Sequence, residues 1–472
     1  MGKKSRSWYF FEGLKGDKVV WMIVLTLIMW SIVCIFSSTS TTKEVMSGTS
    51  TRVDVVLDLL KVIVLGVLLM LGCYNFIGVK GYRKLAQLGF GLSALLLVVV
   101  VSHFDSLPFF KAGQINGAWR VIKIGGLQLH IYEVIKVAMV MYLAWAVDAF
   151  QNKDFKAANL LSKLNHFHWL GKPGWQKVIY IYAPMFFVMV LVALGSGSSS
   201  VFIGGIMFVT ILIGGLGIKE LIKPALVLVA LVGGTILLNK ATDGRLLAGT
   251  RLETWESRLK GSEDSYEAFH NAKPKSIEYY EALDDLRQPY SAKIALKQGG
   301  LIGKGAGQST QRYVVPVMYE DYMFSFIVEE YGLLGALVVI ILYVSLLARG
   351  TIIVKHCQDN FGRITVAGLV LLISGQAMLH MFVNTGIMPL TGQTLPIISY
   401  GASSFVVFCI AFGVILSISR DTTKKIDKET KNAEPLKIVM HEGVQGELEV
   451  LDSFESNDQS GDIEDFSEEI EL

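Results

Sequence analysis

The amino-acid sequence predicts an all-α polytopic membrane protein with about ten transmembrane helices and a large outer loop between the seventh and eighth helices. Three observations predict this fold class. Hydrophobic residues make up 52% of the 472 residues and charged residues only 18%, which is too apolar for a soluble globular protein of this length. Apolar runs of membrane-spanning length recur along the chain. Lys and Arg gather in alternate connections between those runs.

Each predicted helix is an apolar run close to the roughly 20 residues that a helix needs to cross the hydrocarbon core. Helices suit this environment because they satisfy their own backbone hydrogen bonds, which lipid cannot do. The expected spans are residues 19–37, 54–76, 85–101, 131–150, 178–194, 201–218, 221–238, 322–347, 364–385 and 395–418.

The distribution of basic residues predicts the orientation of these helices, because short cytoplasmic connections carry the excess of Lys and Arg. We therefore expect a multi-pass protein of the cell inner (plasma) membrane with both termini in the cytoplasm. The basic connections are Lys80 to Lys84, Lys153 to Lys177, Lys219 to Lys223, Arg349 to Arg363 and Arg420 to Lys425.

These boundaries divide the chain into a cytoplasmic N-terminal segment (1–18), a ten-helix membrane domain (19–420) and an acidic cytoplasmic tail (421–472). Within the membrane domain, residues 240–320 form the large periplasmic loop. A second outer segment, 103–130, is a candidate for re-entrant structure.

The strongest chemical signal is a glycine-rich segment, GGLIGKGAG at 299–307, that precedes the carboxylate pair Glu320 and Asp321. Glycines allow tight turns and a close approach of backbone to a ligand. Lys304 and Arg312 supply positive charge where a phosphate could bind. Without further information, an ordinary surface loop explains the same residues.

A longer ordered pattern surrounds this segment, and a second one follows it. The second pattern is NTGIMPLTGQTLPIISYGASS at 384–404, which includes Tyr400 and Ser403. The first pattern comprises Gln288, Ala295, Gly299, Gly300, Leu301, Gly303, Gly305, Gly307, Ser309, Gln311, Asp321, Phe324, Glu329, Glu330 and Gly332.

Together these patterns resemble the signatures of the SEDS family of bacterial cell-wall glycosyltransferases, and the first helix resembles its division branch. Arg120, Glu133 and Lys136 match a third family motif, in which the last two residues act either as a structural ion pair or in handling the substrate. A fourth motif departs from the family, because LGSGSSSV at 194–201 lacks the family's acidic residue.

The resemblance implies a peptidoglycan glycosyltransferase that polymerises lipid II into glycan strands during cell division and releases undecaprenyl pyrophosphate. For the family's loop base, the favoured residue is Asp285, followed by Asp284 and then Asp264; solvated loop acids are the alternative. The implied pyrophosphate contacts are Arg120, Arg251, Lys304 and Arg312, while Gln288 and Asp321 would position the loop or the substrate.

The resemblance also implies partners and a cofactor. The partners are a class B penicillin-binding protein (a transpeptidase), other divisome membrane proteins and membrane lipids, with no nucleic acid. A divalent cation, Mg or Mn, fits a departing pyrophosphate, and no organic cofactor is expected. The sequence contains no dedicated metal-ligand spacing.

Two other classes of function fit the same helices. A flippase that transports lipid-linked precursor would place its essential charges along a central cavity, whereas the informative residues here cluster at the outer loop. A non-catalytic scaffold would only recruit and activate a transpeptidase.

Overall fold

The chain divides into two units, Met1–Asp421 and Thr422–Leu472. Most of the predicted span at 221–238, together with Arg251, Asp264 and nearly all of the acidic tail, lies outside the described residues. The computed structural model describes residues 15–38, 52–102, 111–115, 118–124, 127–163, 168–222, 224, 226, 267, 269–274, 276–315 and 318–423.

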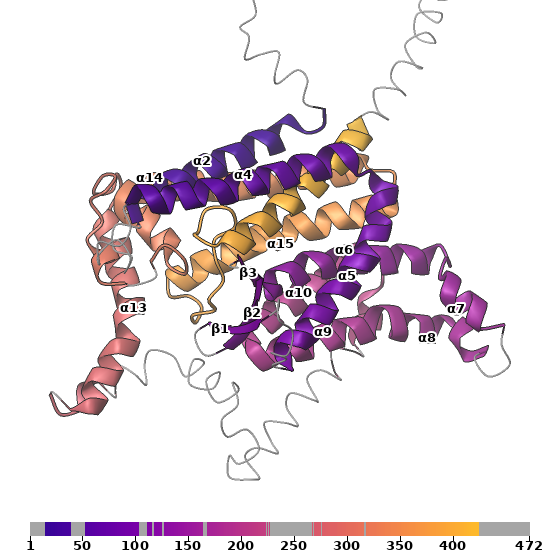
Figure 1. Ribbon diagram of the computed structural model, residues 1–472, viewed down its shortest axis with the longest axis horizontal. Coiled ribbons are helices and arrows are strands. Elements are labelled where there is room, and N and C mark those ends of the chain that lie inside the picture. Colours follow the sequence, from indigo (N-terminus) through magenta and orange to yellow (C-terminus); the bar gives the residue numbers. More distant parts are fainter. Residues whose placement is uncertain are drawn as a thin grey trace, which may run out of the picture. The chain divides into compact units, whose positions relative to one another are not determined.

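Long apolar helices form the first unit (Figure 1), which confirms the predicted fold class. Seven described segments are long and apolar enough to cross a membrane. They are α2 (Lys18–Ser38), α4 (Arg52–Phe76, apolar from Val56), α5 (Val79–Val101), the stretch Pro173–Gly195, α14 (Met323–His356), α15 (Asn360–Asn384) and the helix Ala402–Thr423.

Two further helices coincide with predicted spans. One is α10 (Gly197–Ile213), which is shorter than the others. The second, α6 (Ile131–Gln151), carries Glu133, Lys136 and Asp148 within its length. The stretch Pro173–Gly195 is itself composite, with α8 (Pro173–Lys177), a π-helical turn (Val178–Tyr182) and α9 (Ala183–Gly195). It follows α7 (Lys156–Leu161) and a 3₁₀ turn (His168–Gly171).

The last predicted helix begins later than expected. It starts at Ala402 rather than at residue 395. Pro396 lacks the N–H that a helix needs, and Ile397 adopts a left-handed φ of 68°. Residues 385–401 therefore form a loop between α15 and the last helix, which we call the signature loop because it contains most of the second sequence pattern.

The outer segment at 103–130 contains a small sheet instead of the expected re-entrant structure. Strands β1 (Lys111–Ile115), β2 (Ala118–Ile124) and β3 (Leu127–His130) pair antiparallel in that order, with Val121 opposite His130. The β-branched residues of AWRVIKI favour a strand. Because β3 leads directly into α6, the sheet is joined to the N-terminal end of that helix.

Packing places α15 at the centre of the described helices, against α14, α6 and α10. The segment expected as a long loop also contains a helix, α13 (Ile277–Gly299), which packs against α14 and α15. In Figure 1, α13 runs across the direction of α4 and α15. It thus covers one end of these helices and does not run parallel to them.

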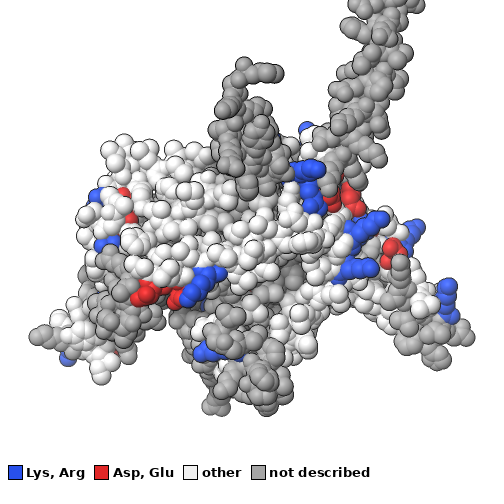
Figure 2. Space-filling view, turned by 45° about the horizontal axis from the view of Figure 1, so that its top comes forward, with Lys and Arg blue, Asp and Glu red and all other residues white. Residues whose placement is uncertain are grey.

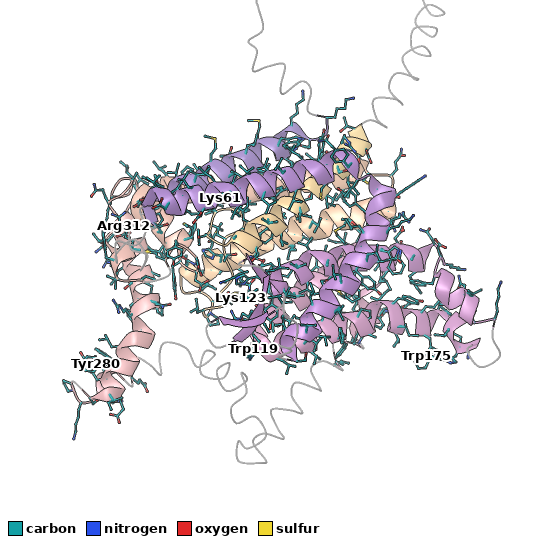
Figure 3. The ribbon with its side chains drawn as sticks, viewed as in Figure 1. Lys61, Trp119, Lys123, Trp175, Tyr280 and Arg312 are labelled. Atoms are coloured by element: carbon teal, nitrogen blue, oxygen red, sulfur yellow. The ribbon has the colours of Figure 1, made fainter. Side chains whose placement is uncertain are left out.

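Basic side chains gather toward one end of the helices. In the view of Figure 2, most visible Lys and Arg side chains lie toward the end of the helices where α7 lies. At cytoplasm-assigned ends of the helices, Arg349 pairs with Asp17 at 2.6 Å, and Arg83 pairs with Asp148 at 2.7 Å and with Asp359 at 2.8 Å. Figure 3 places Trp175 toward this end and Arg312 toward the opposite one.

Candidate functional site

The glycine-rich segment forms hydrogen bonds to the backbone of α14 where that helix is interrupted. Gly332 has φ 66° and ψ −167°, so the helix is interrupted there. An interrupted helix leaves backbone groups without helical partners, and the segment supplies replacements. Leu333 N–H donates to Gly300 O at 3.0 Å, and Lys304 N–H donates to Glu329 O at 2.9 Å. We call this backbone contact between the glycine-rich segment and the break in α14 the junction.

Close approach explains why glycines occupy this segment. A Cβ atom on Gly299 would lie 2.0 Å from Val328 O, and one on Gly303 would lie 2.3 Å from Glu330 O. Both distances are far shorter than a van der Waals contact. Gly299 and Gly303 therefore serve the packing of backbone on α14, whereas the sequence had suggested contact with a ligand.

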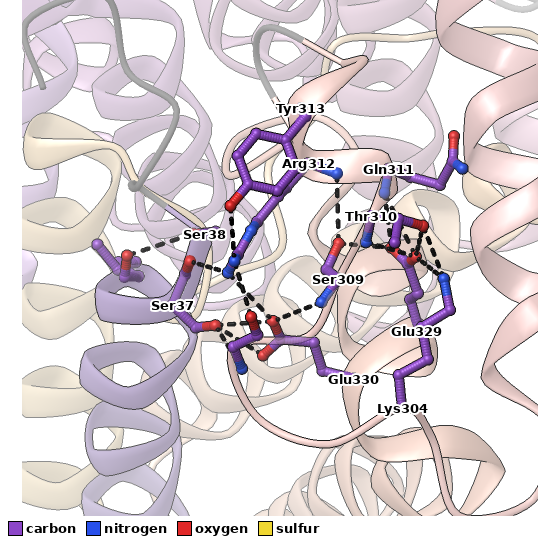
Figure 4. Close-up of polar contacts among 12 residues, drawn as sticks. Ser37, Ser38, Lys304, Ser309, Thr310, Gln311, Arg312, Tyr313, Glu329 and Glu330 are labelled. Carbon is purple, nitrogen blue, oxygen red and sulfur yellow. Dashed lines mark hydrogen bonds and ion pairs between the residues drawn. The ribbon is translucent and has the colours of Figure 1, made fainter. Parts of the chain in front are cut away.

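Lys304 neutralises the first of two buried carboxylates (Figure 4). Glu329 is fully buried and accepts hydrogen bonds from Lys304 Nζ at 2.6 Å, Ser309 Oγ at 2.5 Å and Thr310 N at 2.9 Å. A buried charge is tolerated only when it is paired and hydrogen-bonded. Lys304 is therefore engaged within the junction.

Arg312 is engaged with the second carboxylate, Glu330, which is also fully buried. Arg312 Nη1 lies 3.7 Å from Glu330 Oε1 and donates to Ser37 O at 2.9 Å. Ser37 Oγ donates to both oxygens of Glu330, at 2.7 and 2.8 Å. The C-terminal end of α2 is thereby joined to the junction, a role for Ser37 that the sequence did not indicate because nothing local marks it.

A second buried cluster surrounds Lys136 on α6. Its Nζ lies 2.7 Å from Glu133 Oε1, which confirms the ion pair expected from the spacing of three residues. It also donates to Gln376 Oε1 at 2.5 Å and to Gln393 Oε1 at 3.0 Å. The charge on Lys136 is therefore fully coordinated by α6, α15 and the signature loop.

Further hydrogen bonds extend this cluster. Gln393 Nε2 donates to Ser199 Oγ at 2.8 Å, and His380 Nδ1 lies 2.7 Å from Gln393 O. Ser199 belongs to the 194–201 stretch that lacks the family's acid, so a hydroxyl group enters the network there. The sequence could have indicated this cluster through Gln376 and His380, two polar residues that lie four positions apart on the mostly apolar helix α15.

The signature loop and the helix ends on either side of it contact several predicted site residues. Tyr400 N donates to Tyr319 O at 2.9 Å, and their rings meet edge to face with centroids 5.6 Å apart. Ser403 Oγ accepts from His130 N at 3.2 Å. Asn384 Nδ2 donates to Asp321 O at 3.0 Å.

Arg120 on β2 lies beside the same loop. Its Nη1 is 4.0 Å from the place that a Cβ on Gly392 would take. Burial is the main cause that lowers the pKa of nearby His130, and Arg120 lowers it further, against the opposing effect of Glu133. The sheet therefore brings a cation to the signature loop.

Glu320 differs from the other buried acids. It is partly buried, and its carboxylate has no hydrogen bond or ion pair to the residues that the structure describes. Burial, and then the neighbouring charge of Asp321, raise its pKa from 4.5 to about 7. A carboxyl group with this pKa changes its charge near neutral pH.

The candidate bases Asp284 and Asp285 lie on α13 rather than in an irregular loop. Their side chains are outside what the structure describes, so their roles stay predictions. Gln288, one turn further along α13, is partly buried. Arg251 and Asp264 lie outside the described residues. In the described part of the chain, no three His, Cys, Asp or Glu side chains converge as metal ligands.

The sequence is similar to a known protein family and to several of its members. Residues 17–424 match the family model FtsW/RodA/SpoVE, described as cell cycle protein. The chain is 27% identical to the probable peptidoglycan glycosyltransferase FtsW of Bacillus subtilis, over 89% of this chain and 93% of that protein. It is 37% identical to peptidoglycan glycosyltransferase MrdB of Escherichia coli, over 27% of this chain and 35% of that protein.

Two solved structures share the fold. One is a chain from work on the coordination of polymerization and crosslinking by a peptidoglycan synthase complex, with a TM-score of 0.57 and 20% identity, covering 86% of this chain and 98% of that one. The other is the rod shape determining protein RodA of Thermus thermophilus, with a TM-score of 0.53 and 20% identity, covering 87% and 99%.

Proposed function

Because the chain belongs to the FtsW/RodA/SpoVE family of cell cycle proteins, we propose that it is a peptidoglycan glycosyltransferase. It would polymerise lipid II at the outer face of the membrane and release undecaprenyl pyrophosphate. The observation that carries this proposal is the position of α13, which bears both candidate bases and packs on α14 and α15 beside the junction and the signature loop.

The chemistry requires a proton acceptor and a cation near one another. The attacking sugar hydroxyl must lose its proton to a base within hydrogen-bonding reach, and Asp285 or Asp284 on α13 would be that base. The departing diphosphate needs positive charge that is already in place. Arg120 beside the signature loop would supply part of it, since Lys304 and Arg312 already neutralise Glu329 and Glu330.

We assign the chain to the division branch. The relatives aligned over most of its length are named FtsW, as in Bacillus subtilis, while the match to MrdB covers only 129 residues. By the same reasoning, the partner would be a class B penicillin-binding protein, in line with the synthase complex that contains one of the solved neighbours. Both termini would be cytoplasmic.

A divalent cation, Mg or Mn, remains a prediction. The described residues offer no converging set of three ligands, so no step of the proposed mechanism passes through a metal. Chelation with EDTA followed by addition of each ion, with polymer yield as the readout, tests the requirement.

Reconstitution separates the proposed activity from its alternatives. The full-length chain in liposomes is supplied with labelled lipid II, and both glycan products and movement of lipid II across the bilayer are measured. A polymerase gives a ladder of glycan products. Movement without a ladder would indicate a flippase, which the buried Lys136 cluster would also suit, and neither signal would indicate a scaffold.

A further inference from the structure

Cations near the glycine-rich segment and α13 differ in whether an acid neutralises them. Lys304 and Arg312 are each paired with a fully buried acid, and Lys136 with the partly buried Glu133. Three cations on α13, Arg287, Lys293 and Lys297, are exposed and have no ion pair among the described residues. Besides Arg120, which lies beside the signature loop, α13 therefore offers exposed positive charge to an anionic ligand.

Lys293 is the one of these three that reaches across to α15. A Cβ on Gly386 would lie 2.9 Å from Lys293 Cε and 3.5 Å from its Nζ, so the side chain rests on the backbone just after the end of α15. Gly386 has a φ of 78°, which favours glycine on its own account. Lys293 thus joins the two sequence patterns, one on α13 and one in the signature loop.

Lys293 lies among an aromatic ring and polar groups. Its Nζ lies 5.4 Å from the ring centroid of Tyr290, one turn earlier on α13, and such a contact favours a cation over the ring. Two residues before Gly386, Asn384 donates to Asp321 O at 3.0 Å. Lys293 therefore lies where α13, α15 and the start of α14 meet.

We propose that Lys293 binds the diphosphate of the lipid-linked substrate at the junction of α13 and α15. The assignment rests on the proposed function and adds a residue that the sequence motifs did not indicate. A Lys ammonium is a compact charge on a flexible stem, so it can follow the diphosphate as the sugar is transferred. The glycine at 386 leaves room for the stem of the lysine.

The test measures binding separately from turnover. Full-length protein in nanodiscs of neutral lipid is titrated with a polyprenyl diphosphate and with the corresponding monophosphate. The variants are Lys293→Met, which keeps length and removes charge, Lys293→Arg, which keeps the charge, and Lys297→Met as a matched control one turn further along the same helix.

For Lys293→Met, the Kd for the diphosphate is expected to rise about tenfold, the size of one charge-assisted hydrogen bond. The Kd for the monophosphate should rise less, Lys293→Arg should stay near the wild type, and Lys297→Met should change both values by less than about twofold. Equal unfolding temperatures of the variants would exclude a loss of fold as the cause.

Three results would overturn the assignment: an unchanged diphosphate Kd in Lys293→Met, an equal rise in Lys297→Met, or an equal loss for both lipids. A wild-type protein that binds the diphosphate but makes no glycan would instead contradict the proposed polymerase activity. In that case the Lys293 assignment would still be decided by the binding data.

Discussion

At the scale of single residues, the junction consists of two buried acids that depend on their partners. Lys304→Met would leave Glu329 buried without its cation, and loss of one partner of a buried pair costs about 3 kcal/mol or more. We expect a matching decrease in the free energy of unfolding in detergent. The double variant Lys304→Met/Glu329→Gln should recover much of it. A double-mutant cycle with no coupling between the two positions would contradict the pairing.

Glu320 predicts a dependence of stability on pH. Its pKa in the folded protein is raised from 4.5 to about 7, so the folded state binds a proton that the unfolded state releases at lower pH. The contribution of Glu320 to stability is therefore greatest below pH 4.5 and decreases as the pH rises through 7. Unfolding temperatures between pH 5 and 8 should fall less steeply in Glu320→Gln. An unchanged slope would refute the assignment.

The sequence predicted only some of these residue roles. The Glu133–Lys136 pair followed from a spacing of three on one helix, and it is confirmed at 2.7 Å. The engagement of Lys304 and Arg312 with acids was not foreseen, because their partners become near neighbours only when the backbone of α14 breaks at Gly332. The roles of Asp284 and Asp285 stay predictions.

At the scale of elements, the break in α14 gives a sharp test of the junction. Gly332 has a φ of 66°, and a Cβ there would lie 2.3 Å from Leu301 O. Gly332→Ala should therefore lower the free energy of unfolding by more than about 2 kcal/mol, through strain and a steric clash. In the control Gly72→Ala, the new Cβ meets open space, and a small gain of up to about 1 kcal/mol is expected from helix propensity. Similar effects of the two substitutions would argue against the junction.

Hydropathy predicted the spans well and the connections poorly. Apolar length alone located α2, α4 and α15 to within a few residues, because lipid imposes that length on any helix. The sheet of β1 to β3 and the helix α13 were missed. Their residues are polar enough to resemble loops, and their structure depends on packing against α5, α6 and α14 rather than on local periodicity.

At the scale of the whole molecule, the account requires the junction and α7 to face opposite sides of the membrane. In a cysteine-free background, Ile302→Cys and Leu160→Cys provide exposed probes, since these side chains are 74% and 68% exposed. A membrane-impermeant thiol reagent should label the cysteine at 302 in intact cells and the cysteine at 160 only after permeabilisation. The reverse pattern would place the candidate site on the cytoplasmic side and exclude lipid II polymerisation at the outer face.

The most direct test of the central claim, sugar transfer by a base on α13, is the glycan product of reconstituted full-length protein given labelled lipid II. The account predicts a ladder for the wild type and for Glu278→Gln, an exposed acid of the same helix. It predicts no ladder for the double variant Asp284→Asn/Asp285→Asn, which should retain wild-type unfolding. A full ladder from the double variant would contradict the account.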